Sequence, residues 1–255
     1  MNLLKLLRYR HRAWKARRHN ERAEIAAMLD LLRPGDTVLD IGAHKGSYLY
    51  WLRQAVGAQG RVLAFEPQPL LAAYLHEVVA AMGWKNVTVE NQGISDRHGT
   101  LALHIPGAAG AVSPGATFEA NVSPGAAGRT CEVGVTTLDD LFPAGSKPPA
   151  FIKCDVEGHE LAVFRGGERL LRGSRPTLLF ECEARHLGGR PITEIFALLE
   201  AWGYTGRFFA PGGLLPLGEF LPEVHQRGDT LRFWDASDYC NKFLFEALPS
   251  PGPRQ

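Results

Sequence analysis

The six residues at 155–160, DVEGHE, carry the side chains of this chain best suited to proton transfer. They directly follow the apolar run 151–154, which is typical of a buried strand. A histidine titrates near neutral pH and a carboxylate can accept a proton, so His159 or Asp155 is the predicted general base. Glu157 would orient that base or bind an acceptor. The alternative is that His159 only begins the following helix and moves no proton.

A second motif, TVLDIGAHKG over residues 37–46, suits the binding of a ligand by the backbone. An apolar run reaches Asp40, glycines follow at Gly42 and Gly46, and a helical pattern begins at Ser47. Strand, glycine turn and helix is how an open α/β sheet approaches a nucleotide-like ligand. A carboxylate inside the turn would repel a pyrophosphate but suits a ligand with an ammonium group. S-adenosylmethionine (SAM) is such a ligand, although glycine turns also end ordinary βα units.

Glu66 ends the next apolar run, 61–65, and lies 26 positions after Asp40. Doubly wound folds place an acid near this point, where it hydrogen-bonds ribose hydroxyls. Pro67 then stops the strand, because proline has no N–H to offer a neighbouring strand. Glu66 is therefore the predicted ribose ligand, with a solvated strand end as the alternative.

The chain resembles the FkbM family of SAM-dependent methyltransferases, within the class I Rossmann-like superfamily. The resemblance is carried by stretches at 40–46, 62–69, 91–106, 137–142, 151–171, 178–183 and 241–247. It implies a SAM-dependent O-methyltransferase that acts on a hydroxyl of a sugar, glycolipid or secondary metabolite. His44 departs from the superfamily, because many members have a glycine at that position of the turn.

The expected cofactor is SAM. Its methionine end should meet Asp40 and the glycine turn, its ribose Glu66, and its adenine the loop 91–96. The expected cofactor-binding residues are Asp40, Gly42, Ala43, Gly46, Ser47, Glu66, Ser95 and Asp155.

The fold class expected from the order of elements is α/β. Alternating strands and helices predict a doubly wound, mainly parallel sheet, and the resemblance implies seven strands with an antiparallel last strand. The predicted strands are 37–41, 61–65, 87–90, 100–105, 151–154, 177–180, 203–209, 231–234 and a final edge strand at 242–246. The predicted helices are 23–32, 47–56, 69–82, 160–171 and 192–201.

The chain divides into three parts by composition: a basic helical arm over 1–32, a methyltransferase domain over 33–248 and a disordered tail over 249–255. Within the domain, residues 107–129 are rich in Gly, Ala and Pro. Long loops of this kind in compact domains are often functional, so a lid over the acceptor site is one interpretation. A tolerated surface insertion is the other.

The arm carries most of the charge asymmetry. Residues 1–22 hold eight Lys or Arg against one acid, Glu21, so their charge is +7 and the remainder, with 20 basic and 26 acidic residues, carries −6. Leucines near the start make peripheral contact with an anionic membrane one interpretation. The others are packing against the fold or a partner subunit, as in a homodimer, and contact with nucleic acid.

Composition predicts a cytoplasmic protein, and peripheral contact with a membrane is compatible with that prediction. We expect no membrane span, since no run of about 18 apolar residues occurs. The start lacks the features of a signal peptide, and the four cysteines show no paired spacing, so neither disulfides nor a zinc site is expected.

No metal is required by the sequence. Some class I O-methyltransferases hold Mg²⁺ between carboxylates after the fourth and fifth strands, and Asp155, Glu181 and Glu183, or His186, could supply such ligands.

Two other functions remain as alternatives to O-methylation of a small-molecule or glycan acceptor. One is a nucleic-acid methyltransferase. It is disfavoured, and no nucleic-acid partner is expected, because DVEG replaces the Asn/Asp-Pro-Pro-aromatic motif of amino methyltransferases. The other is a non-catalytic SAM- or dinucleotide-binding module, which the acids at both ends of the predicted site disfavour.

Overall fold

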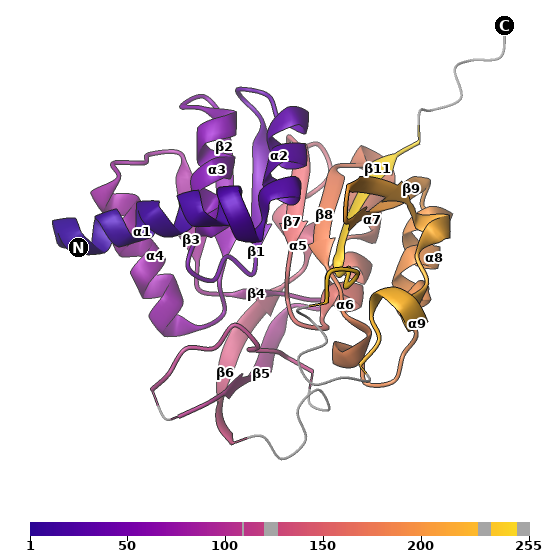
Figure 1. Cartoon of the computed structure of the whole chain (residues 1–255). Coiled ribbons are helices and arrows are strands. Elements are labelled where there is room, and N and C mark those ends of the chain that lie inside the picture. Colours follow the sequence, from indigo (N-terminus) through magenta and orange to yellow (C-terminus); the bar gives the residue numbers. More distant parts are fainter. Residues whose placement is uncertain (109, 120–126, 229–235, 249–255) are drawn as a thin grey trace, which may run out of the picture.

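The computed structural model describes residues 1–108, 110–119, 127–228 and 236–248 (Figure 1). Its centre is an eight-stranded sheet in the order β10-β9-β11-β8-β7-β1-β2-β3. These strands are β1 (Thr37–Ile41), β2 (Arg61–Phe65), β3 (Val87–Glu90), β7 (Phe151–Cys154), β8 (Thr177–Glu181), β9 (Tyr204–Ala210), β10 (Gly213–Pro216) and β11 (Lys242–Ala247).

Strand direction follows the sequence prediction, whereas the position of the last strand does not. β3, β2, β1, β7 and β8 are parallel, and β11 runs antiparallel to β8. β11 is not an edge strand, since it also pairs with β9 and buries Phe243, Leu244 and Phe245. The short β10 pairs antiparallel with β9 and adds an eighth, outer strand. The strand predicted at 231–234 lies outside the described residues.

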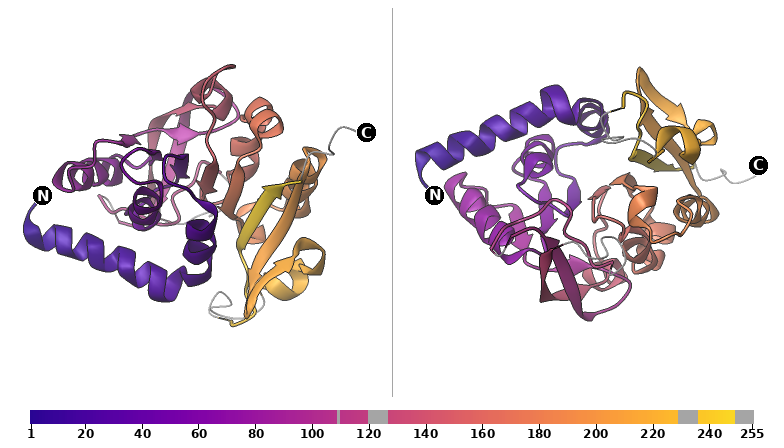
Figure 2. Two further views of the ribbon diagram at one scale, coloured as in Figure 1. Left: turned by 90° about the horizontal axis from the view of Figure 1, so that it is seen from above. Right: turned by 60° about the horizontal axis from the view of Figure 1, so that its bottom comes forward.

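Helices cover both faces of the sheet, as the doubly wound prediction requires (Figure 2). Successive strand residues point to opposite faces, so Val38 packs with one helical layer and Leu39 with the other. The first layer contains α1 (Leu3–Lys15), α2 (Arg22–Leu31), α3 (Ser47–Val56) and α4 (Pro69–Ala81). The second contains α5 (Leu138–Leu141), α6 (Glu160–Arg165), α7 (Glu168–Ser174) and α8 (Thr193–Ala201). The short α9 (Pro222–His225) follows β10.

The helix predicted over 160–171 is broken into α6 and α7 at Gly166 and Gly167. A Cβ at Gly166 would lie 2.0 Å from the Ser95 carbonyl oxygen, so this close approach needs a glycine. The break is a consequence of packing that the helical pattern alone could not show.

A small second sheet, absent from the sequence prediction apart from β5, lies beyond the carboxyl ends of the central strands (Figure 1). It contains β4 (Gly93–Ile94), β5 (Gly99–Pro106) and β6 (Gly128–Thr136) in the order β4-β6-β5. β5 and β6 form a long antiparallel pair that buries Leu103, Ile105 and Val133. The Gly/Ala/Pro-rich segment therefore connects two paired strands, and its last two residues already belong to β6.

The N-terminal arm packs against the domain through one side of α1. Tyr9 and Ala13 have no exposed surface, and the Tyr9 hydroxyl donates to the Gly46 carbonyl at 3.1 Å. The Trp51 indole N–H donates to the Ala13 carbonyl at 2.8 Å. A five-residue π-helix (Ala16–Asn20) joins α1 to α2.

Candidate active site

A cavity of about 620 Å³, here called the first cavity, opens beyond the carboxyl ends of β1, β2 and β7. Its lining includes Gly42, Glu66, Gln92, Asp155 and Glu157.

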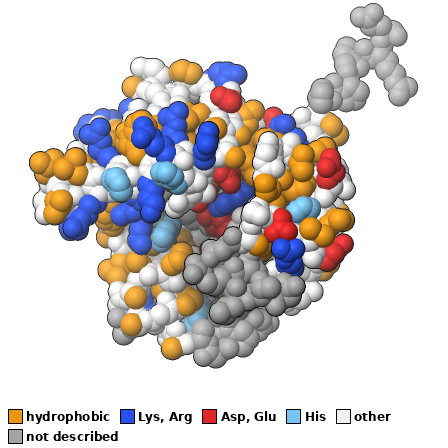
Figure 3. Space-filling view, viewed as in Figure 1, with side chains coloured by type: hydrophobic (Ala, Val, Ile, Leu, Met, Phe, Trp, Pro, Cys, Tyr) orange, Lys and Arg blue, Asp and Glu red, His pale blue; other side chains and the backbone are white. Residues whose placement is uncertain are grey.

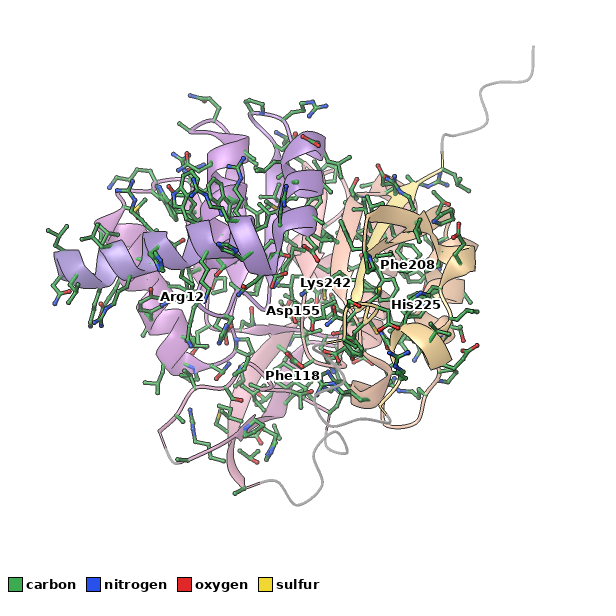
Figure 4. The ribbon with its side chains drawn as sticks, in the orientation of Figure 1. Arg12, Phe118, Asp155, Phe208, His225 and Lys242 are labelled. Carbon is green, nitrogen blue, oxygen red and sulfur yellow. The ribbon has the colours of Figure 1, made fainter. Side chains whose placement is uncertain are left out.

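A second cavity of about 660 Å³ lies between the glycine turn and the N-terminal arm. Its polar lining includes Arg12, Lys15, Ser47, Lys153 and Asp155. Asp155 lies at the centre of the molecule between the arm that bears Arg12 and the strand that bears Lys242 (Figure 4). Gly42, His44 and Asp155 line both cavities, so the two meet at the glycine turn.

The glycine turn is shaped by contact with the end of β7. Gly42 has a φ of 72°, and a Cβ there would lie 1.8 Å from the Asp155 carbonyl oxygen, so only glycine fits. His44, in place of a glycine, adopts a φ of 48°. Such a conformation costs a non-glycine residue about 1–3 kcal/mol and is held only where its surroundings enforce it.

Glu66 is one of the groups that hold this turn. Its carboxylate accepts a hydrogen bond from the His44 backbone N–H at 2.7 Å and from the Gln68 backbone N–H at 2.9 Å. The side chain is buried yet lines the first cavity. Burial raises the pKa of Glu66 to about 7, because desolvation penalises the ionised carboxylate. This acid therefore titrates in the physiological range.

Asp40 does not reach either cavity, contrary to the sequence prediction. Its side chain has no exposed surface, and neither oxygen accepts a hydrogen bond from the described residues. The Lys153 ammonium lies 3.4 Å from Asp40 Oδ1 and donates to the Gly42 carbonyl at 2.8 Å. Burial raises the pKa of Asp40, and the Lys153 charge opposes that shift. Asp40 thus pairs with a buried lysine beneath the turn.

Asp155 has the charge and position expected of a catalytic group. Its side chain is 28% exposed and lies 3.6 Å from the Lys153 ammonium. Burial opposes its ionisation, but the Lys153 and Lys242 charges outweigh burial and lower the pKa of Asp155. The carboxylate is therefore ionised at neutral pH at the meeting point of the cavities.

Glu157 forms a pair with His186, whose Nδ1 lies 3.1 Å from Glu157 Oε2. Burial, with the nearby charge of Asp155, raises the pKa of Glu157 to about 9, and burial lowers the pKa of His186. At neutral pH the pair shares one proton. The chain at Gly158 passes so close to His186 that only glycine fits there, because a Cβ would lie 2.3 Å from the His186 carbonyl oxygen. Glu157 itself has a φ of 54°, a second strained backbone at this site.

His159, one of the two predicted bases, lies outside both cavities. Its Nε2 lies 2.9 Å from the Ser95 hydroxyl, and its Nδ1 lies 2.7 Å from Glu119 Oε1. The ring is buried, and both nitrogens are occupied by these partners. Ser95 is fully buried and also lines neither cavity, contrary to its predicted cofactor contact. Ser95, His159 and Glu119 therefore form one hydrogen-bonded chain, which links the loop after β4 to the residue that precedes α6.

Two members of the predicted carboxylate set for Mg²⁺ are brought together, and the third is replaced. Asp155, Glu157 and Glu181 each place an oxygen within 4.8 Å of the others. Glu181 pairs with the Lys242 ammonium and accepts from Asn241 Nδ2 at 2.9 Å. Glu183 is turned away, because it accepts hydrogen bonds from Arg185 and Tyr239. Although burial opposes ionisation, these bonds lower the pKa of Glu183 to about 2.

Of the remaining predicted cofactor-binding residues, two line a cavity and one does not. Ala43 and Ser47 line the second cavity. Gly46 lines neither cavity. Its φ of 76° favours glycine, and a Cβ at this position would lie 2.9 Å from Leu75 Cδ2. Gly46 is therefore required by packing against α1 and α4.

The family is shown by comparison with known proteins. The Methyltransferase FkbM domain matches residues 40–205, which is more than half of the chain. The chain belongs to the FkbM methyltransferase family. It thus contains a SAM-dependent methyltransferase domain, and the sequence resemblance is confirmed.

Similar solved structures agree with the fold of an FkbM methyltransferase. A methyltransferase FkbM from Methylobacillus flagellatus KT has a TM-score of 0.52 and 16% identity, over 85% of this chain and 48% of that one. A putative rRNA-methylase from Clostridium thermocellum has a TM-score of 0.52 and 11% identity, over 89% of this chain and 94% of that one.

Curated relatives match a shorter segment. The ribosomal RNA large subunit methyltransferase E of Sorangium cellulosum (strain So ce56) is 40% identical over 60 residues, 24% of this chain and 28% of that protein. A protein-L-isoaspartate O-methyltransferase of Ignicoccus hospitalis is 40% identical over 58 residues, 23% of this chain and 28% of that protein. The chain therefore spans about a quarter of the length of these relatives.

The first cavity of this FkbM domain fits SAM in its donor chemistry. Gly42 of the turn lines this cavity, and Glu66 retains lone pairs on both oxygens after its two backbone bonds. Gln92 and Gly93, from the loop predicted to face adenine, line the same cavity. Glu66 can therefore accept further hydrogen bonds from a group inside this cavity.

Several lining residues of the FkbM domain were not predicted from the sequence. The side chain of Gln68 forms two hydrogen bonds with the backbone of Ser113: it donates to the carbonyl at 2.9 Å and accepts from the N–H at 3.0 Å. The Thr117 hydroxyl donates to the Glu157 carbonyl at 2.7 Å, and Phe118 lines the first cavity. The composition of 107–129 indicated a loop, but carried no signal for these contacts.

Proposed function

We propose that this FkbM protein transfers a methyl group from SAM to a hydroxyl of a small-molecule or glycan acceptor: a sugar, a glycolipid or a secondary metabolite. One observation carries the proposal: Glu66 and the acids Asp155 and Glu157 line the same cavity. This arrangement supports a site in which Glu66 would bind ribose and Asp155 would accept a proton.

Methyl transfer to an alcohol needs alignment and removal of a proton. When bound, SAM supplies a methyl group on a sulfonium sulfur, which keeps the electron pair of the broken C–S bond. The acceptor oxygen forms the new C–O bond, and Asp155 receives the hydroxyl proton as this bond forms. Correct positioning of the reacting groups is worth about 7–11 kcal/mol in favourable cases, and the close backbone contact between Gly42 and Asp155 supports it.

The Glu157–His186 pair has a positioning role in this proposal. Because burial raises the pKa of Glu157 to about 9, its carboxyl is protonated at neutral pH and can donate a hydrogen bond to an acceptor oxygen, while Asp155 remains ionised. This separation of protonation states between neighbouring acids is typical of acid–base sites.

The proposed reaction is tested by calorimetry and mass spectrometry together. SAM and S-adenosylhomocysteine should bind and NAD should not. Candidate sugars, glycolipids and phenolic or alcoholic metabolites should then be screened for a gain in mass of one methyl group. NAD binding without SAM binding would contradict the proposal and favour the dinucleotide module.

Nucleic acid is the second acceptor class. It is favoured by the rRNA methyltransferases among the relatives and by the eight cations of residues 1–22. Methylation of ribosomal RNA with no product from any hydroxyl metabolite would establish this class instead. The cytoplasm is the compartment we propose for either reaction.

The described part of the Gly/Ala/Pro-rich segment is proposed to cover the acceptor site. Pro114, Ala116 and Phe118 line the first cavity, and Gln68 fastens the segment through Ser113. We expect Gln68→Ala to make proteolysis between 110 and 119 about tenfold faster, since two hydrogen bonds are lost.

SAM should slow this cleavage in the unchanged chain. Limited proteolysis followed by mass mapping gives the rates. Equal rates with and without SAM, and in the variant, would leave the segment as a surface insertion.

Mg²⁺ is not needed in the proposed mechanism. The carboxylates Asp155 and Glu181 already face ammonium groups, those of Lys153 and Lys242. We therefore expect methyl transfer to be unchanged after dialysis against EDTA, measured by the rate of S-adenosylhomocysteine formation. Loss of activity that Mg²⁺ restores would assign Asp155, Glu157 and Glu181 as its ligands.

A further inference from the structure

The side of α1 that faces away from the domain exposes large apolar side chains. Leu3 is 72% exposed, Leu7 51% and Trp14 40%. Their spacings of four and seven residues place them on one stripe of a helix with 3.6 residues per turn. Tyr9 and Ala13, on a different side of the helix, are fully buried. α1 therefore has an inner apolar face used in folding and an outer apolar stripe, in which Leu3 and Leu7 are more than half exposed and Trp14 is partly covered by an edge contact with Trp51, 5.0 Å between ring centroids.

Cations border the outer stripe on both sides. At 100° per residue, Arg8 and Lys15 lie on one flank and Arg10 on the other, and all three are exposed. No acidic residue occurs before Glu21. Figure 3 shows Lys and Arg side chains along this face, with hydrophobic side chains at the end of the helix that bears the N-terminus. This surface is complementary to a partner that is negatively charged and apolar beneath its charged layer.

An anionic lipid bilayer has this chemistry. Amphipathic helices with cations beside an apolar stripe lie in the headgroup region, and tryptophan favours that depth. Each Lys or Arg near an anionic leaflet adds about 1 kcal/mol. Single-stranded nucleic acid would instead use a series of aromatic stacking platforms, whereas this stripe has one aromatic side chain, Trp14, beside its leucines. A second copy of α1 in a two-fold contact would bring like-charged flanks together.

We propose that α1 docks the protein on an anionic lipid surface, with Leu3, Leu7 and the exposed part of Trp14 inserted among the headgroups. Arg12 and Lys15 of the same helix line the second cavity, so docking brings the candidate site next to the bilayer. The arm is held in place for this role, because Arg12 donates to the Lys45 carbonyl at 3.2 Å and to the Tyr74 hydroxyl at 3.3 Å. No helix among the described residues is long and apolar enough to span a membrane.

The experiment is co-sedimentation of the full chain with vesicles of phosphatidylcholine, with and without phosphatidylglycerol, at low and high salt. We expect binding to the anionic vesicles, weakened by salt, and much weaker binding to the neutral ones. The double variant R8Q/R10Q should bind anionic vesicles about thirtyfold more weakly. L7S/W14S should lose binding at least as strongly.

The matched control is L221S/V224S, which removes two exposed apolar side chains near α9, on the other side of the molecule (Figure 1). It should bind like the unchanged chain. Thermal melting and SAM binding of every variant report folding and the site separately from docking, so a failure of the proposed reaction leaves this test intact.

Four outcomes would overturn the proposal. The first is equal binding to neutral and anionic vesicles, or none to either. The second is unchanged binding of the folded L7S/W14S variant. The third is tighter binding of a structured RNA than of anionic vesicles, which would assign α1 to nucleic acid. A dimer in sedimentation that L7S/W14S abolishes would likewise overturn the proposal and assign α1 to a second copy of the chain.

Discussion

Asp155→Asn is expected to lower kcat for methyl transfer by about 10²–10⁴-fold, the usual contribution of a positioned general base. The amide keeps the size of the carboxylate but cannot take the hydroxyl proton. The effect should fall on kcat, because Glu66 and the glycine turn still bind SAM. Initial rates of S-adenosylhomocysteine formation, with SAM affinity from calorimetry, separate the two contributions.

Two comparison variants sharpen this result. Asp140→Asn removes an exposed acid of α5 outside both cavities and should leave kcat unchanged. His159→Gln removes a buried hydrogen-bonded ring, so we expect a loss of stability of about 1–3 kcal/mol with kcat little changed in the folded fraction. Near-normal turnover of Asp155→Asn would contradict the mechanism, and a large kcat loss in His159→Gln alone would return the base to His159.

Glu66→Gln is expected to weaken SAM binding by about 10- to 150-fold. The ionised carboxylate would accept charge-assisted hydrogen bonds from ribose hydroxyls, each worth about 1.5–3 kcal/mol, and the neutral amide loses this gain. Calorimetric titration measures the change in Kd. Glu90→Gln, at the exposed end of the neighbouring β3, is the matched control and should bind SAM normally. Unchanged Kd in Glu66→Gln would place the ribose elsewhere.

The raised pKa of Glu66 gives the same contact a pH dependence. In the free protein this pKa is about 7, and binding of ribose hydroxyls favours the ionised carboxylate. Below pH 7 the carboxyl must therefore lose a proton when SAM binds, and affinity should fall by up to about tenfold per pH unit. Above pH 7 it should level off. Titrations in buffers of different ionisation enthalpy count the released protons, and Glu66→Gln should release none.

Local pattern was sufficient for the strands that carry the site. The apolar runs before Asp40, Glu66 and Asp155 became β1, β2 and β7, and the parallel order of these strands brought Glu66, Asp155 and Glu157 to one cavity. This inference works because parallel strands all end at the same edge of a sheet, so residues at their carboxyl ends lie near one another.

Strand-end position did not settle which way each side chain points. Asp40 and Glu66 both lie at the carboxyl edge, yet Asp40 turns inward because Lys153, 113 residues away along the chain, supplies the opposite charge. In the same manner, His159 pairs with Glu119 and Glu183 pairs with Arg185. Their partners are set by which loops lie beside them in space, and no local spacing encodes that.

The sequence by itself determined the family, the doubly wound sheet and the acids at its carboxyl edge, because these depend on periodicity and on residues close together along the chain. Only the tertiary structure decided the order of β11 and β9, the second small sheet and the orientation of α1. Those features depend on contacts between distant segments, whose free energy exists only once the segments have packed together.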